Sequence, residues 1–525
     1  MKLGKLIFLF ALSFAVALPV QSKRAMKGLK TVVQPDGSTL SIRVAGDEHS
    51  HFIFAESGEL LCKDNDGFYR LGAIAPDGAV VSSGIGLLDP RAESVALKAA
   101  DLDLQSIAMR RVGKRRAPQS GLGMSATKYP VTGNPKGLII LVEFSDLKFT
   151  SQEGYDAPTY FNEMINGENF DIFGGTGSAR QYFADQSGGK FIPDFDVLGP
   201  VTLPEKMVFY GANDRYGEDE NPHLMVTQAI EILDADIDFS RYDNDGDGVI
   251  DSVYVFYAGQ GEADFGSDDT IWPHAWDVRY GGVNKNVDGV TIGPYACSNE
   301  WDLFDPSGVG TFIHEFSHVM GLPDLYHTWD ANAVYTPDEY SVLDYGPYNN
   351  RGRTPPNYGA YEKNALGWFD PIMLDEPCIV SLKPVSTGKF CLIPTEKDTE
   401  FFLLENRQLE GWDEYIPNHG MLIWHIDYVA AKFENNVVNN TKSHQYVDIV
   451  EANDIQDFNY SDGYTFPGTS GNSAFTSSTT PALKSWSGKP IDIPITNITE
   501  AGGMITFDVS GGEEFQEAPL INIHE

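Results

Sequence analysis

The alternation of hydrophobic and polar residues divides the chain into distinct regions. In residues 23–108, short apolar runs alternate with the turn sequences QPDGS, DNDG and APDGA, which predicts a small β-rich unit. Residues 109–130 combine basic residues with Pro and Gly, and we interpret them as an exposed linker. A new globular unit then begins with the apolar run GLIILVEFSD at residues 137–146, a pattern typical of a buried strand.

Helical and strand patterns are mixed within residues 131–370. Helical spacing covers three segments: 159–166, 178–185 and 223–236. A strongly apolar strand, SVYVFYAG, follows at 252–259, so this unit is predicted to be an α+β domain. From residue 371 to residue 511 the pattern changes to successive strands, which favours a β-sandwich. Residues 512–525 form an acidic tail with no predicted structure.

The N-terminus has the features of a cleavable signal peptide. A short basic start precedes an apolar run from Leu6, and small residues follow it. We therefore expect residues 1–22 to be removed and the protein to be secreted, into the medium or the periplasm. No later segment is apolar enough to cross a membrane.

The net charge limits the classes of partner. The chain has 37 basic and 75 acidic residues, a balance of −38, and such a surface repels nucleic acid and anionic membranes. The cysteines are too widely spaced for a disulfide scaffold or a zinc ribbon: Cys62, Cys297, Cys378 and Cys391. Whether Cys378 and Cys391, which flank a predicted hairpin, form a pair is left open.

The sequence HEFSHVMGLPD, which begins at His314, predicts a metal site. His314 and His318 are four residues apart, so on a helix both imidazoles project from one face and can bind one ion. Glu315 is adjacent to the first ligand, where a carboxylate can take a proton from metal-bound water. Gly321 can end the helix, and Asp324 then supplies an oxygen ligand. Two nitrogens and one oxygen leave the fourth position of zinc open, as in catalytic sites.

Alternatives to this ligand set exist within the sequence. A bare HExxH also occurs by chance on ordinary helix faces, but the extension through Gly321 and Asp324 meets two further constraints, as in the metzincin motif. His327 lies just beyond Asp324 and competes with it as third ligand. Three other histidines are expected in the core or behind the ligands: His274, His419 and His425.

A second signal is SVLDYG at residues 341–346, which is similar to the Met-turn beneath the zinc of metzincins. Leu343 occupies the methionine position. Because that residue packs under the ligands without binding the metal, leucine of similar volume should support the same floor. Tyr345 is a candidate to reach the zinc or to stabilise an oxyanion, and a buried core tyrosine is the alternative.

The sequence DNDGDGVID at residues 243–251 predicts a calcium loop of EF-hand type. Oxygen ligands fall at loop positions 1, 3, 5, 7 and 9: Asp243, Asp245, Asp247, the Val249 carbonyl and Asp251. The glutamate of position 12 is missing, since Tyr254 stands there. We expect a structural calcium ion that pins the following strand, and the alternative is a solvated acidic turn.

These motifs, together with the sequences IWPHAW and HGMLIWHIDY, resemble the immune inhibitor A-like metalloproteases of bacteria over roughly residues 25–510. The resemblance implies secreted zinc endopeptidases of the metzincin kind that are made as latent precursors. It places zinc on His314, His318 and Asp324, with Glu315 as general base. Members commonly carry methionine at the turn, where this chain has Leu343.

The sequence therefore predicts a metzincin-like catalytic domain, a β-rich propeptide before it and a β-sandwich after it. The expected protein is a monomeric zinc endopeptidase that hydrolyses proteins or peptides and also binds calcium. A zinc exopeptidase or amidase, an inactive binding or adhesion protein, and an N-terminal domain that stays attached are the alternatives.

The sequence also gives a hypothesis for how the precursor is kept inactive. An Asp, Glu or Cys within residues 23–110 is expected to occupy the open position of the zinc, and Cys62 is the only thiol there. Cleavage is expected near Arg110, Arg111 or residues 114–116.

Overall fold

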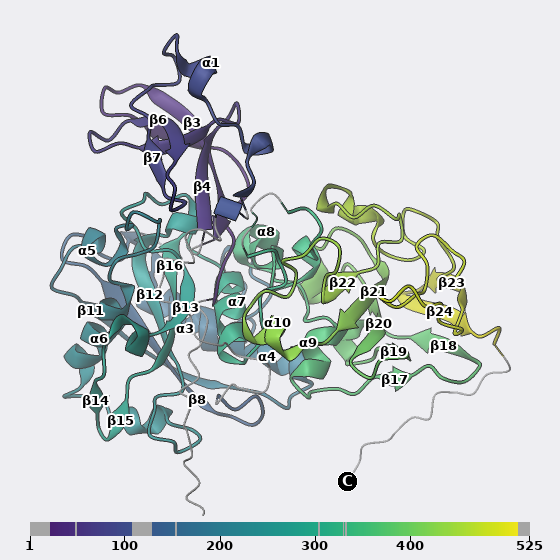
Figure 1. Cartoon of the computed structure of the whole chain (residues 1–525). Coiled ribbons are helices and arrows are strands. Elements are labelled where there is room, and N and C mark those ends of the chain that lie inside the picture. Colours follow the sequence, from purple (N-terminus) through teal and green to yellow (C-terminus); the bar gives the residue numbers. More distant parts are fainter. Residues whose placement is uncertain are drawn as a thin grey trace, which may run out of the picture.

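The computed structural model describes residues 21–47, 50–104, 106–107, 129–152, 155–302, 305–328, 330 and 333–512. The predicted signal peptide lies outside these ranges except for its last two residues. Most of the basic linker and nearly all of the acidic tail also lie outside them. Figure 1 shows three bodies: an N-terminal sheet at the top, a large sheet with helices below it, and C-terminal strands beside the helices.

The N-terminal body is an antiparallel meander of six strands in sequence order. The strands are β2 (Lys30–Val33), β3 (Thr39–Asp47), β4 (Ser50–Ala55), β5 (Leu60–Lys63), β6 (Tyr69–Ile74) and β7 (Val80–Ser82), and the short helix α1 (Ala92–Val95) follows. Each predicted turn sequence connects two strands and contains a glycine at positive φ, the conformation that glycine adopts without strain. The predicted β-rich character of this region is confirmed.

The large sheet has the strand order β1-β13-β16-β12-β8-β11. Its strands are β1 (Gln21–Ser22), β8 (Lys136–Glu143), β11 (Asp194–Thr202), β12 (Val253–Gln260), β13 (His274–Asp277) and β16 (Pro294–Trp301). Strands β11, β8, β12 and β16 run parallel, whereas β13 and β1 run antiparallel to their neighbours. Residues 21–22 thus form an edge strand of a sheet whose other strands begin more than a hundred residues later.

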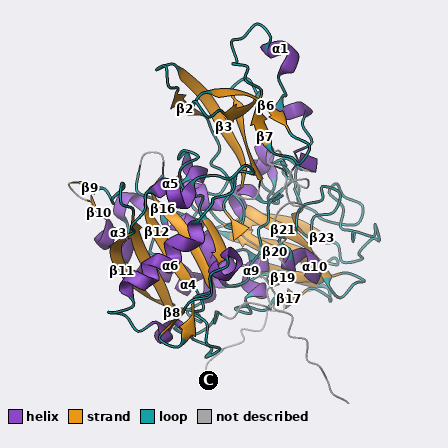
Figure 2. Ribbon diagram, turned by 60° about the vertical axis from the view of Figure 1, so that its left-hand side comes forward, coloured by secondary structure: helices purple, strands orange, loops and turns teal. Residues whose placement is uncertain are grey.

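Helices cover both faces of this sheet, as Figure 2 shows. One face packs against α3 (Ala157–Asn166), α4 (Ala179–Ser187) and α7 (Val309–Val319), and the other against α5 (Met207–Gly211) and α6 (Pro222–Leu233). Successive residues of β8 alternate between the two cores, which explains its unbroken apolar run. The mixture of helices and strands is as predicted, but the four parallel strands with helices on both faces are closer to an α/β arrangement than to α+β.

Local sequence accounts for the helix ends. Asp156 caps α3 by accepting a hydrogen bond from the Thr159 N–H, and Ser178 caps α4 through the Gln181 N–H. Gly188 ends α4 in the left-handed conformation. Short elements complete this region: β9 (Ser151–Gln152), β10 (Tyr155–Asp156), β14 (Asn286–Val287), β15 (Val290–Thr291) and α8 (Asn349–Gly352).

The C-terminal body contains a five-stranded and a three-stranded sheet. Its elements are α9 (Ala360–Ala365), β17 (Ile372–Met373), β18 (Cys378–Leu382), β19 (Cys391–Pro394), β20 (Glu400–Arg407), β21 (Gly420–Asp427), α10 (Ala430–Glu434), β22 (Val447–Ile449), β23 (Ile495–Ala501) and β24 (Met504–Val509). On β20, Phe402 and Leu404 face the three-stranded sheet, while Leu403 belongs to the core that contains α7. The five-stranded sheet is therefore buried on both faces and shares one core with the zinc-motif helix.

Among the described helices, none has the length and apolar character needed to span a membrane. The four cysteines are free thiols, with Cys297 and Cys391 buried and Cys62 and Cys378 partly buried.

Candidate metal centre

Helix α7 presents the zinc motif from the interior of the protein. Its residues from Val309 to His318 are buried, and Phe312 and Phe316 pack against the sheet through Phe195. Gly321 follows the helix with a φ of 92° and ends it as the sequence predicts. The histidines are therefore held on a fixed helix rather than on a surface loop.

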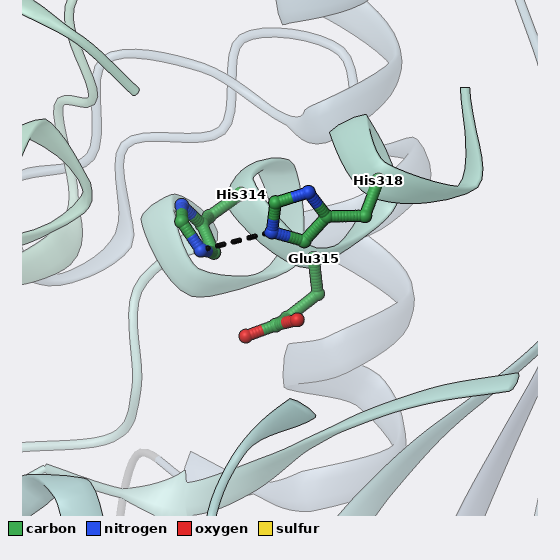
Figure 3. Close-up of side chains that lie close together, drawn as sticks. All are labelled: His314, Glu315 and His318. Atoms are coloured by element: carbon green, nitrogen blue, oxygen red, sulfur yellow. Dashed lines mark hydrogen bonds between the residues drawn. The ribbon is translucent and has the colours of Figure 1, made fainter. Parts of the chain in front are cut away.

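The two imidazoles point toward each other, as Figure 3 shows. The Nε2 atoms of His314 and His318 are 3.2 Å apart, and Glu315 offers a carboxylate oxygen within 4.8 Å of a ring nitrogen of each histidine. The Nδ1 atom of His314 lies 2.7 Å from the Val342 carbonyl oxygen, and that of His318 lies 2.8 Å from the Leu322 carbonyl oxygen.

These carbonyl contacts fix the tautomers. A carbonyl oxygen only accepts, so each Nδ1 donates its proton to a carbonyl and Nε2 is the ring atom left to bind a metal. The two Nε2 atoms are 3.2 Å apart, close enough for both to bind one ion. Histidines that bind zinc through one ring nitrogen usually donate the N–H of the other to a carbonyl or carboxylate oxygen, as Nδ1 does in both of these residues.

Asp324 supplies the third candidate ligand atom beside the two histidines. Its Oδ1 atom lies 3.4 Å from Nε2 of His314 and 3.3 Å from Nε2 of His318. Tetrahedral zinc with ligand distances of about 2.0–2.2 Å places its ligand atoms about 3.3–3.6 Å apart. Oδ1 is buried and accepts no hydrogen bond from the described residues. The three atoms therefore fit a zinc ion, with one coordination position left over.

The charge of Asp324 suits this role. Burial alone raises the pKa of its carboxyl, but the two histidines and a hydrogen bond from Asn436 outweigh burial and hold the pKa below its usual value. The competing residue, His327, instead lies against Tyr335, with ring centroids 6.2 Å apart, and burial lowers its pKa to about 4.

The turn at residues 341–346 lies beneath the histidines. Leu343 is fully buried in the same core as α7. Its carbonyl oxygen accepts the Leu325 N–H at 2.8 Å, and the neighbouring Val342 carbonyl orients His314. Because a Cβ on Gly346 would lie 2.3 Å from the Ser341 carbonyl oxygen, only glycine allows this tight turn. Leucine thus fills the floor position as expected.

Tyr345 is engaged by the N-terminal segment. Its hydroxyl oxygen accepts the Lys27 N–H at 2.9 Å, the Lys27 Nζ lies 4.0 Å from its ring centroid, and its ring packs against Tyr348. Burial raises the pKa of its hydroxyl above the usual value.

Residues 21–27, here called the N-terminal segment, enter the large domain beside α7. Lys23 is buried and donates to both carboxylate oxygens of Asp264 at 2.9 and 3.0 Å and to Thr311 Oγ1 of α7 at 2.7 Å. Arg24 pairs with Asp344 at 2.9 Å and Lys27 with Asp338 at 2.6 Å. The sequence offered no signal for this insertion beyond three basic residues in an acidic chain.

The acidic loop gathers three carboxylates. Asp243, Asp245 and Asp247 each offer an oxygen within 4.8 Å of the others. The carboxylate of Asp243 accepts backbone N–H groups of residues 246, 247 and 248. Asp251 lies apart from this group, because its Oδ2 accepts the backbone and side-chain N–H groups of Asn244, both at 2.8 Å. Burial raises the pKa of Asp251 to about 6.

The remaining sequence candidates have other partners. His274 lies between the Trp272 carbonyl oxygen and the Tyr295 hydroxyl, His419 contacts Glu500, and His425 contacts Glu400. Cys62 lies on β5, where its thiol contacts the carbonyl oxygens of Lys63 and Val80.

A histidine pair and a buried carboxylate at tetrahedral spacing, with a glutamate beside them on a helix against a mixed sheet, define a metallopeptidase domain. Residues 126–369 match the catalytic domain of the immune inhibitor A peptidases, family M6, which supports the assignment of this domain as a metalloendopeptidase.

Curated relatives agree with this assignment. The chain is 29% identical over 268 residues to "Immune inhibitor A" of Bacillus thuringiensis subsp. alesti, which covers 43% of this chain and 39% of that protein. It is also 29% identical over 249 residues to "Pre-pro-metalloprotease PrtV" of Vibrio cholerae serotype O1, covering 42% of this chain and 26% of the relative. The matched part thus spans less than half of these relatives.

Proposed function

We propose that this protein is a secreted zinc endopeptidase of the metzincin kind that hydrolyses peptide bonds in proteins. The observation that carries the proposal is the set of three ligand atoms, Nε2 of His314, Nε2 of His318 and Oδ1 of Asp324, 3.2–3.4 Å apart beside Glu315. The family match and the metalloprotease relatives support the same class.

The chain's own groups then have defined roles. His314, His318 and Asp324 would hold the zinc, which when bound supplies Lewis acidity for hydrolysis at neutral pH. Glu315 takes a proton from the attacking water and returns it to the leaving amine. The Tyr345 hydroxyl, once released from Lys27, is the candidate to stabilise the developing oxyanion.

We propose that the N-terminal segment keeps the protein latent. Residues 23–27 would remain attached after removal of the predicted signal peptide, residues 1–22, and they enter the large domain beside α7. The segment also bonds to α7 through Lys23 and to Tyr345 through Lys27, and it lines a cavity of about 310 Å³ next to Tyr345 and Tyr348. This differs from our sequence hypothesis, in which Asp, Glu or Cys62 was the blocking group. Basic residues that pair with acids of the large domain carry the contact instead.

We propose that the acidic loop binds a structural calcium ion through Asp243, Asp245, Asp247 and the Val249 carbonyl, with Asp251 behind them. Asn244 supports this role, because its side chain bonds both to Asp251 and to the backbone of Lys136 at the start of β8. An ion here would fix the loop to strand β8.

The test is mass spectrometry of peptides released from a long unstructured substrate by the purified, zinc-loaded chain. We expect internal cleavage that a zinc chelator stops and that Glu315→Gln lowers by about 10²–10⁴-fold with zinc still bound. Removal of terminal residues only would identify an exopeptidase instead. Zinc binding without any cleavage, after activation as described next, would identify an inactive binding protein.

Latency is tested on the same assay. We expect Lys23→Ala combined with Arg24→Ala to raise the activity of the uncleaved chain, whereas Cys62→Ala leaves it unchanged. Activity of the unmodified chain equal to that of the double variant would contradict the role of the N-terminal segment.

A further inference from the structure

The connection between β21 and β22 reaches the metal centre from the C-terminal body. The two strands are antiparallel neighbours, for which a turn of two to five residues suffices. The chain instead runs from residue 428 to residue 446 before it returns. Such long connections in a compact protein usually have a function of their own. Figure 1 shows its helix α10 beside α9, on the side where α7 lies.

Helix α10 fixes where this connection points. Phe433 is fully buried in the core shared with α7 and packs against Tyr428 and Tyr361. The helix ends at Glu434, and Asn436, two residues later, has a φ of 52°. Asparagine is one of the few residues other than glycine that adopt this left-handed conformation after a helix. The local sequence therefore turns the Asn436 side chain inward, where it is buried.

Both polar atoms of the Asn436 side-chain amide form hydrogen bonds with Asp324. Its Oδ1 accepts the Asp324 backbone N–H at 2.8 Å, and its Nδ2 donates to the Asp324 Oδ2 at 2.6 Å. The other carboxylate oxygen, Oδ1, is the one that faces the two histidines. The amide thus determines which oxygen of the ligand points to the metal.

Two further asparagines extend this contact along the loop that follows Asp324. Asn439 donates to the Leu325 carbonyl oxygen at 2.8 Å. Asn440 accepts the Thr328 N–H at 3.0 Å and donates to Thr328 Oγ1 at 2.9 Å. Residues 436–440 therefore hold the backbone of the ligand loop at several successive points.

We propose that Asn436 is a positioning residue of the zinc site, so that the metal centre is complete only with the C-terminal body. It lies well beyond residues 126–369, the part that matches the catalytic domain family. An amide is suited to the task because it donates a hydrogen bond without a charge that would compete with the metal for the carboxylate. The inference deepens the proposed function, since it concerns the same zinc site.

The test compares zinc affinity in full-length variants by competition with a chromophoric chelator. Asn436→Gly keeps the left-handed backbone and deletes both hydrogen bonds to Asp324. We expect its zinc affinity to fall by about 10–100-fold, the usual loss when a group that orients a ligand is removed. Asn440→Ala is the matched control, because it deletes two hydrogen bonds from the same segment to Thr328, and its affinity should stay within about threefold of the unmodified protein.

A second readout separates positioning from general destabilisation. The visible spectrum of the cobalt-substituted protein reports ligand geometry, and we expect it to change in Asn436→Gly but not in Asn440→Ala. Asn436→Asp, which keeps the shape and loses the donor, should weaken zinc binding as well and serves if the glycine variant does not fold. Unchanged affinity in both Asn436 variants, or an equal loss in Asn440→Ala, would overturn the proposal. Neither readout requires peptidase activity, so an inactive protein would refute the proposed function without touching this inference.

Discussion

The proposed zinc centre and the acidic loop are two clusters of metal-ligand type with opposite construction. The acidic loop is short and partly exposed, and its carboxylates accept hydrogen bonds from the loop's own backbone. The zinc centre is buried, and the groups that orient its ligands come from Val342, Leu322 and Asn436. A loop of the first kind holds its shape through local contacts, whereas the second depends on the assembly of the whole fold.

This difference predicts how each cluster responds to amino-acid substitutions. Damage to the acidic loop should remain local and affect stability, because its carboxylates bond to the loop's own backbone and its external links include those of Asn244 to Lys136 and the bridge of Val249 to Thr291. Damage to the zinc centre should alter metal binding even when the change lies far away in sequence. The four predictions below test that contrast, from the largest expected effect to the smallest.

The largest effect is expected from loss of the proposed third ligand. Asp324→Ala should lower zinc affinity by more than the roughly 100-fold typical of changes behind the ligands, since a direct ligand is removed. Metal analysis after dialysis measures this. Asp245→Ala in the acidic loop is the control and should retain zinc. Full zinc content in Asp324→Ala would mean that another residue, such as His327, is the third ligand.

The stability of the protein should depend on the side-chain volume at Leu343, which lies beneath the two histidines. Leu343→Ala leaves a cavity in the shared core and should reduce the free energy of unfolding by about 2–5 kcal/mol. Leu343→Met, which conserves volume, should cost less than about 1.5 kcal/mol and retain zinc. Urea unfolding of both variants measures the two values. A methionine variant as unstable as the alanine variant would show that the turn requires the shape of leucine.

A buried carboxyl beside this floor should make stability depend on pH. Burial, and then repulsion from Glu405, raises the pKa of Glu362 from 4.5 to about 7. The folded state therefore binds this proton more tightly than the unfolded state, so the stabilising contribution is complete below about pH 4.5 and is lost as the pH rises toward 7.

Glu362→Gln should remove that dependence. At about 1.4 kcal/mol per pKa unit, the variant should gain at most about 3 kcal/mol relative to the unmodified protein between pH 4.5 and pH 8. Urea unfolding at both values measures the difference. Lys363, whose pKa burial lowers to about 7, acts in the opposite direction above pH 7. Because the charge of Glu362 raises this pKa, the substitution also alters the Lys363 contribution above pH 7. Parallel pH profiles would show that Glu362 titrates normally.

The smallest effect is expected at the acidic loop. Calcium at 100 times its dissociation constant stabilises a protein by about 2.7 kcal/mol, and Asp243→Asn should remove part of that gain. Thermal unfolding with and without calcium measures it, and zinc should not substitute for calcium. Equal stability of the unmodified protein in both conditions would show that the loop is a solvated acidic turn.

Much of the fold follows from local patterns. Helices α3, α4 and α6 and strands β8 and β12 lie where apolar spacing predicts them, because each buries a face or a whole run in one continuous core. Strand β22 and the insertion of residues 21–22 beside β13 were not predicted. Both are short, and their pairing depends on partners distant in the sequence.

The sequence by itself determined the candidate metal ligands, because spacing on a helix places His314 and His318 on one face wherever that helix lies. It also determined the acidic loop, whose carboxylates accept hydrogen bonds from backbone groups a few residues away in the same loop. Only the tertiary structure decided which oxygen of Asp324 faces the histidines and which side chain orients it. That choice depends on Asn436, more than a hundred residues away, and hydrogen-bond geometry between distant segments exists only once the chain has folded.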